Sequence, residues 1–331
     1  MDWSGIFRNA MTAAFNEGAV AYALAALGLN IHFGFTGLLN FGQVGFMAVG
    51  AYGVAISSSY YGWHPVVALA VGIGACVVLA LLLGLPALRL RADYLAISTI
   101  AASEMIRLTA RAAALRNFSG GSQGINGWAG RFYSWSPFDQ KTRYGIGPVK
   151  YLGNTFWVIV IGWLVVMACT VGIYLLMRSP WGRVLKSVRE DEDAARALGK
   201  NAYWFKVQSL VLGGVLGGLA GMVLAIAQQT AQPDVYQPQV TFFVWTALIL
   251  GGVGRVWSPI VGAILFNLLF ALSDGIVRGL AATEALPVGI LDGVKASQVV
   301  FMLIGAGLAL LIVFRPQGIF GNRNEMRLEA N

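Results

Sequence analysis

Residues 18–88 read GAVAYALAALGLNIHFGFTGLLNFGQVGFMAVGAYGVAISSSYYGWHPVVALAVGIGACVVLALLLGLPAL, a run of 71 residues without aspartate, glutamate, lysine or arginine. A membrane-spanning helix needs about 20 consecutive apolar residues, so this run has room for about three crossings. Interruptions at residues 34–37 and 57–65 divide it, and it ends at Arg89. The stretch therefore predicts an all-α, polytopic membrane protein.

The composition of the whole chain agrees with this class. Of its 331 residues, 57% are hydrophobic and only 11% are charged, whereas about a quarter are charged in a soluble domain. An ordinary cytosolic enzyme, a disordered protein and a secreted disulfide scaffold are excluded. The 42 glycines favour membrane helices in close contact. We assign the net charge of +8 to loops beside the membrane rather than to nucleic-acid binding.

Further apolar runs raise the expected number of spans to about nine, within a range of eight to ten. They cover residues 94–108, 156–177, 207–227, 240–254, 256–274 and 296–314. Two of the nine spans, 36–57 and 240–254, contain glycine-rich interruptions and are expected to be broken helices. We interpret residues 1–331 as a single transmembrane domain.

The orientation follows from the basic loops, because short cytoplasmic loops are enriched in lysine and arginine. The loop 178–206 carries seven of them, Arg178, Arg183, Lys186, Arg189, Arg196, Lys200 and Lys206. Placing this loop in the cytoplasm puts Arg89, Arg91, Arg255 and the tail 315–331 on the same side. The N-terminus and the loop 117–153 are then external.

The glycine-rich interruptions are the candidate substrate pathway, because irregular backbone at membrane depth is tolerated only against protein or a water-filled cavity. The positive end of the half-helix after the first break is suited to a carboxylate. Close helix packing of the glycines is the competing interpretation, and both can hold. The candidates are Gly37, Asn40, Phe41, Gly42, Gln43 and Gly45 in the first break and Gly251, Gly252 and Gly254 in the second.

The chain contains no G-x-x-x-x-G-K-[ST], H-E-x-x-H or G-x-S-x-G motif, so we expect no nucleotide, metal or hydrolase site. The pair Glu104 and Arg107 lies three residues apart on one helix face. An ion-coupled carrier would use such an acid, but the pair lies near the end of its apolar run, where the arginine can reach the interface. A carrier and a passive channel remain the alternatives from other classes.

The loop 178–206 contains a predicted docking element. Asp191 is suited to cap a short helix, and Gly199 is suited to the left-handed position that ends it. Leu185, Val188, Ala195 and Leu198 fall at helical spacing and are expected to share one face. A solvated connector is the competing interpretation. The candidate coupling residues are Asp193, Ala194, Ala195, Leu198 and Gly199.

Five motifs in order resemble one family. They are residues 37–52 (GLLNFGQVGFMAVGAY), 88–97 (LRLRADYLAI), 119–125 (SGGSQGI), 182–199 (GRVLKSVREDEDAARALG) and 314–321 (FRPQGIFG). Together they resemble the LivM-type permease subunits of high-affinity ABC importers for branched-chain amino acids, which have the type II importer fold. Residues 193–199 (DAARALG) also resemble the E-A-A-x-x-x-G element with which ABC permeases dock on their ATPases, with aspartate in place of glutamate.

The resemblance implies a complex in a bacterial inner membrane. It would contain a second related permease, two ATP-binding subunits that use ATP and Mg²⁺, and an external solute-binding protein, while this chain itself binds no cofactor. Related sugar permeases carry G-x-D-L-S-x-G where residues 37–42 read GLLNFG, which favours the amino-acid branch. Importers of urea and short amides are close relatives and remain the alternative.

Overall fold

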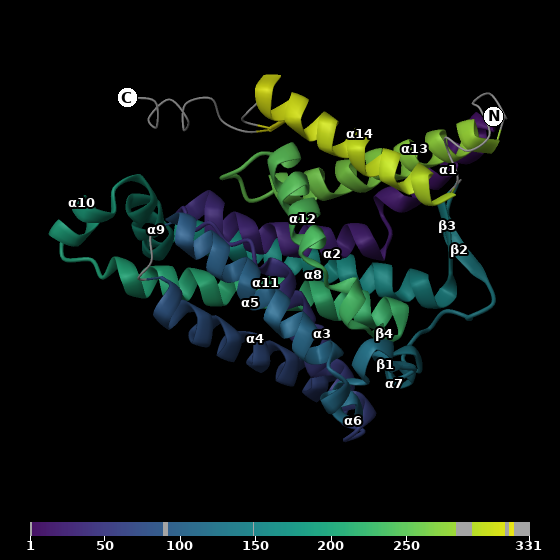
Figure 1. Cartoon of the computed structure of the whole chain (residues 1–331), viewed down its shortest axis with the longest axis horizontal. Coiled ribbons are helices and arrows are strands. Elements are labelled where there is room, and N and C mark those ends of the chain that lie inside the picture. The colour runs from purple at the N-terminus through teal and green to yellow at the C-terminus, as the bar shows by residue number, and fades with distance from the viewer. Residues whose placement is uncertain (1, 89–91, 148, 283–292, 315–317, 321–331) are drawn as a thin grey trace.

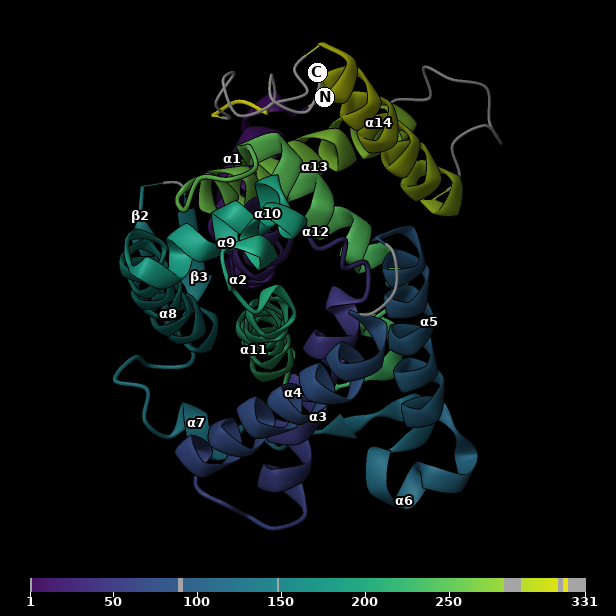
Figure 2. The ribbon, with the colours of Figure 1, turned by 90° about the vertical axis from the view of Figure 1, so that its left-hand side faces the viewer.

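The computed structural model describes residues 2–88, 92–147, 149–282, 293–314 and 318–320. The chain forms a bundle of helices (Figure 1). At its centre, α2 (Glu17–Leu29) packs on α11 (Ala202–Gln228), as the end-on view in Figure 2 shows. α2 is apolar around its whole circumference and buries almost every residue from Ala19 to Leu29, which is typical of a helix in a protein core.

The remaining long helices surround this pair. They are α3 (Gln43–Ser59), α4 (Pro65–Ala87), α5 (Ala92–Arg111), α8 (Gly153–Arg178), α12 (Pro238–Gly251), α13 (Ser258–Ala282) and α14 (Gly293–Phe314). Glycines bring the inner helices together: a Cβ on Gly28 would lie 2.4 Å from the Gly213 carbonyl oxygen, and one on Gly50 would lie 2.5 Å from that of Gly218. The glycine content thus serves close contacts of α11 with α2 and α3.

The prediction of an all-α, polytopic membrane protein is confirmed. Within the described residues, five helices are long and apolar enough to cross a membrane: Glu17–Phe35, Pro65–Ala87, Gly153–Arg178, Ala202–Gln228 and Ser258–Leu280. The predicted count of nine is not confirmed. α3 and α12 have 17 and 14 residues, and α5 carries several charged side chains.

An N-terminal helix was not expected from the apolar pattern. α1 (Trp3–Ala14) is amphipathic, buries Ala10 and Ala14, and packs against α13. Asp2 caps it by accepting a hydrogen bond from the Gly5 amide at 3.0 Å. Hydrogen bonds to the carboxylate lower the pKa of Asp2 below its usual value; the bond from the Ser4 hydroxyl has the largest effect and the bond from the Gly5 amide the next largest.

Segments that are distant in sequence meet at the two ends of the bundle. At one end, α9 (Pro180–Glu190) and α10 (Glu192–Ala197) extend from the bundle, next to the π-helix η1 (Asn30–Phe35) (Figure 1). The other end carries short elements: η2 (Ala113–Leu115), α6 (Arg116–Ser119), η3 (Gly121–Gln123), α7 (Gly130–Tyr133), η4 (Pro233–Val235) and the antiparallel pairs β1 (Ile125–Asn126) with β4 (Thr230–Ala231) and β2 (Arg143–Ile146) with β3 (Val149–Leu152). The loops 117–153 and 178–206, which were predicted to lie on opposite sides of the membrane, therefore lie at opposite ends of the bundle. The side of the membrane on which each end lies stays a prediction, and the tail 315–331 falls outside the described residues except for 318–320.

Cysteine labelling will establish the sides. Ser122 and Lys200 are exposed at opposite ends of the bundle, so we expect an impermeant maleimide to label Ser122→Cys in intact cells and Lys200→Cys only after permeabilisation. The unsubstituted chain, with Cys76 and Cys169, provides the background. Labelling of Lys200→Cys alone in intact cells would invert the predicted orientation.

Candidate functional site

The first break begins where α2 changes into the π-helix Asn30–Phe35, an irregularity often found at functional sites. The chain then runs without regular structure from residue 37 to 42, and α3 starts at Gln43. Gly37 has φ +74°, a left-handed conformation that favours glycine. The interruption predicted at residues 34–37 is therefore present, and the irregular backbone continues to residue 42.

Asn40 and Gln43 lie in a polar network inside the bundle, together with His32, and all three side chains are fully buried. Asn40 Nδ2 donates to Gln43 Oε1 at 3.0 Å and contacts His32 Nδ1 at 3.1 Å. Gln43 Nε2 donates to the Gly213 carbonyl at 3.0 Å. Because His32 Nε2 lies 3.2 Å from the Leu210 carbonyl, which can only accept, the arrangement fits a neutral imidazole protonated at Nε2.

The glycines of the first break pack closely against α5, as the competing interpretation proposed. A Cβ on Gly42 would lie 2.3 Å from the Thr99 carbonyl oxygen, and one on Gly45 would lie 3.0 Å from Ser103 Cβ. A pathway role for Asn40 and Gln43 would require these packed helices to separate. That role stays a prediction.

Three backbone amides at the start of α3 already have hydrogen-bond partners, so they are not free to bind a carboxylate. The amide of Gly42 donates to Asn40 Oδ1 at 2.8 Å, and that of Val44 donates to Thr241 Oγ1 at 3.0 Å. The Gly45 amide donates to the Gly42 carbonyl at 2.9 Å. In this conformation, a substrate carboxylate would have to displace Asn40, Thr241 of α12 or the Gly42 carbonyl to reach these three amides.

The second break lies between the end of α12 at Gly251 and the start of α13 at Ser258. Gly252 and Gly254 have φ of +109° and +86°, so both depend on glycine. A Cβ on Gly251 would lie 2.0 Å from the Ser258 carbonyl oxygen. The predicted interruption is present, although α12 itself is a regular helix.

Asn30 joins the two breaks, and sequence reasoning did not select it. Its side chain is 1% exposed; Nδ2 donates to the Arg255 carbonyl at 2.9 Å, and Oδ1 accepts from the Gly254 amide at 3.0 Å. One feature of the sequence could have indicated this role: Asn30 is a lone asparagine at the end of an apolar run, four residues before the first glycine-rich break. The two interruptions therefore form one structural unit.

Aromatic side chains border the first break. Phe41 stacks on Trp245 with ring centroids 4.9 Å apart, and Trp245 Nε1 donates to the Asn40 carbonyl at 3.2 Å. Phe242 lies beside Phe41 and is 50% exposed. The edge of the break that reaches the molecular surface is therefore apolar.

The helical hairpin of residues 180–199 partly matches its prediction. Asp191 Oδ1 accepts from the Ala194 amide at 2.9 Å, and Gly199 has φ +75°, which confirms the expected cap and the expected terminus. The expected common face is wrong: Leu185, Val188 and Ala195 are buried, whereas Leu198 is 79% exposed. Asp191 is extended and separates α9 from α10, so helical spacing does not continue across it.

The other coupling candidates are distributed around α10. Ala195 packs with Val188 and Ala202 in the interior of the hairpin. Asp193 and Ala194 are exposed. Only Leu198 thus offers a large apolar surface to a partner, and Ala195 supports the hairpin from inside. A coupling role for the five residues stays a prediction.

Polar side-chain contacts fix this hairpin to the bundle, and in one of them Trp181 Nε1 of α9 donates to Gln208 Oε1 of α11 at 2.6 Å. Glu192 forms ion pairs with Arg196, at 2.7 Å, and with Lys206 of α11. On α9, Arg189 Nη1 donates to the Gly34 carbonyl at 2.6 Å. The hairpin therefore contacts the first break directly.

Glu104 and Arg107 pair as expected, at 2.5 Å. Arg107 also contacts Asp234 at 3.1 Å, and Arg111 contacts the same carboxylate at 3.3 Å. The cluster links α5 to η4. Because its arginines have carboxylate partners on two elements, it has the arrangement of a structural ion-pair network.

Long apolar helices, two interruptions joined inside the bundle and a helical hairpin at one end define a multi-pass membrane transport subunit. The sequence model of the family described as "Branched-chain amino acid transport system / permease component" matches residues 18–304. The chain belongs to this family and is a permease subunit of an ABC importer.

Three relatives illustrate this similarity. The "High-affinity branched-chain amino acid transport system permease protein LivM" of Salmonella typhimurium is 29% identical, with 93% of this chain and 70% of the relative covered. The protein of the same name in Escherichia coli is 29% identical, with 90% and 67% covered. The "Probable branched-chain amino acid transport permease protein LivM" of Methanocaldococcus jannaschii is 25% identical, with 90% of each chain covered.

The link through Asn30 generates a mutational prediction. In Asn30→Ala, the Gly254 amide and the Arg255 carbonyl lose their side-chain partner; because both hydrogen bonds are partly buried, we expect a cost of about 1 kcal/mol for each. We expect a lower unfolding temperature of the purified protein in detergent. Asn267→Ala is the matched control. The hydrogen bond that the structure shows for Asn267 stays within α13, because Nδ2 donates to the Ala263 carbonyl. Equal unfolding temperatures for the two variants would contradict a stabilising link between the breaks.

Proposed function

We propose that this chain and a second, related permease form the pathway by which branched-chain, hydrophobic amino acids enter a bacterial cell. Two ATP-binding subunits would drive transport, and an external solute-binding protein would deliver the substrate. The chain would lie in the inner membrane with its N-terminus outside and its C-terminus in the cytoplasm. The family match over residues 18–304 carries this proposal.

The surface of the first break supports a hydrophobic substrate. Phe33 and Phe41 are half-buried, and Phe242 is half-exposed. An apolar border of this kind favours a leucine-, isoleucine- or valine-like side chain over urea or a short amide, which offer little apolar surface to bury.

The hairpin supports coupling to an ATPase. α10 would present Asp193, Ala194, Leu198 and Gly199 to a groove on an ATP-binding subunit, with Ala195 packed beneath them. ATP and Mg²⁺ would be held by that partner. Displacement of α9 would then act on the first break through Arg189, which bonds the Gly34 carbonyl.

Reconstitution in vesicles tests the proposal against its alternatives. The chain is reconstituted with its partner subunits, ATP is supplied on the hairpin side, and uptake of radiolabelled leucine, isoleucine, valine and urea is compared. We expect uptake of the amino acids only with ATP and the solute-binding protein. Ion-driven uptake by the chain alone would identify a carrier, ATP-independent flux a channel, and preference for urea an amide importer.

Leu198→Asp tests the docking role of α10. The side chain is 79% exposed, so the substitution should leave the fold intact. It should weaken binding to the ATP-binding subunit by about 2 kcal/mol, the free energy of burying a leucine side chain. We expect weaker retention of that subunit during purification and a loss of substrate-stimulated ATP hydrolysis.

The matched control is Leu152→Asp, at a residue that is 50% exposed at the opposite end of the bundle. Wild-type ATPase retention and stimulation in Leu198→Asp would leave α9 and α10 as a connector. Ala195→Asp would not decide the question, because Ala195 is buried inside the hairpin.

A further inference from the structure

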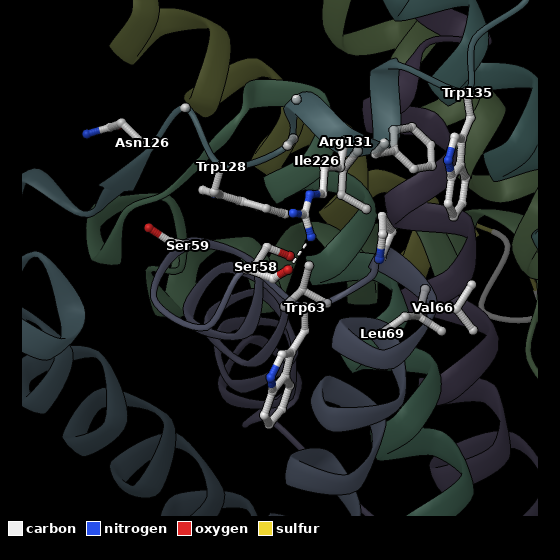
Figure 3. A pocket seen from close by; sticks show the side chains of 17 residues that line it. Ser58, Ser59, Trp63, Val66, Leu69, Asn126, Trp128, Arg131, Trp135 and Ile226 are labelled. Carbon is white, nitrogen blue, oxygen red and sulfur yellow. Dashed lines mark hydrogen bonds between the residues drawn. The ribbon is translucent and has the colours of Figure 1, made fainter.

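A second site lies at the end of the bundle opposite α9 and α10. A cavity of about 530 Å³ opens between the α3–α4 turn and residues 126–135 (Figure 3), a volume typical of small-ligand sites. Val54 and Ala129, at 3% and 2% exposed, belong to its wall, together with Ile226 from the end of α11. The inner wall is therefore apolar.

The cavity opens beside an exposed apolar surface of α4, which we expect to face lipid. α4 contains the most apolar stretch of the five candidate spans: 18 of its residues have a mean hydropathy of 3.0, and only 22% of that stretch is buried. Its first turns contribute Val66 and Leu69, which are 61% and 37% exposed. Trp63 and Trp135 border the cavity at 42% and 45% exposed, as expected of aromatic residues at a membrane–water interface. An occupant thus has direct access from the bilayer.

The polar groups of the cavity favour an anion. Arg131 reaches across it toward the α3–α4 turn (Figure 3), where Nη1 donates to the Gly62 carbonyl; a guanidinium has five N–H donors in all. None of the 17 lining residues is acidic, so the site offers no carboxylate to the ammonium group of an amino acid.

We propose that this cavity binds an anionic phospholipid from the surrounding bilayer. One acyl chain would lie against Val54, Leu69 and Ile226, and the phosphate would accept hydrogen bonds from Arg131. The lipid would then hold residues 126–135 against the start of α4. This proposal depends on the membrane class of the chain and not on the substrate that it carries.

Lipid retention tests the site directly. The full chain is purified with its copurifying subunits, incorporated into nanodiscs of phosphatidylcholine with or without phosphatidylglycerol, released, and analysed by native mass spectrometry. We expect retained phosphatidylglycerol, and about tenfold weaker retention in Arg131→Gln, the effect of losing one charge-assisted hydrogen bond. Arg143→Gln is the matched control, because it removes the same charge from an exposed position outside the cavity lining.

Two further measurements make the outcome specific. Ser59→Trp, at an exposed lining position, should reduce retention by filling the mouth of the cavity. Leucine at millimolar concentration should not displace the lipid. Equal retention of phosphatidylglycerol by wild type and Arg131→Gln, equal retention of phosphatidylcholine and phosphatidylglycerol by wild type, or displacement by leucine would each overturn the proposal.

Discussion

A helix that is interrupted inside a membrane protein must satisfy its freed backbone groups within the protein, because the hydrocarbon core of the bilayer offers no hydrogen-bond partners and each unpaired group costs several kcal/mol. The first break meets this constraint almost residue by residue. The amides of Gly37 and Leu38 return to carbonyls of the π-helix, at 3.0 and 2.8 Å. That of Phe41 donates to Thr99 Oγ1 on α5, at 3.1 Å, that of Gly42 donates to Asn40 Oδ1 and that of Val44 to Thr241 Oγ1.

These partners come from distant parts of the chain, so the break and the bundle depend on each other. Thr99 and Thr241 reach the backbone of residues 41–44 only because α5 and α12 pack directly beside it, and Gly42 permits the approach to α5. Gln43 extends the same dependence to α11 through the Gly213 carbonyl. Substituting a glycine here would therefore disturb several helices, not one loop.

Much of the architecture could be predicted because its signals are local. A charge-free run, glycine clusters and a capping aspartate each report on the residues beside them, so the membrane class, both breaks and the start of α10 were predicted. The link through Asn30 joins residues more than 220 positions apart and leaves no periodic signal. The position of Leu198 was mispredicted for a similar reason: one extended residue, Asp191, ended the helical register on which the prediction rested.

The contacts connect the hairpin at one end of the bundle to both interruptions. α10 is tied to α11 by the ion pair of Glu192 with Lys206, while the neighbouring helix α9 holds the Gly34 carbonyl through Arg189. Gly34 itself packs against the second break, where a Cβ would lie 2.9 Å from the Gly254 nitrogen. In the proposed importer, a displacement of the hairpin would therefore reach Gly34 first. It would then reach the second break through Asn30, because that side chain bonds the backbone at both Gly254 and Arg255.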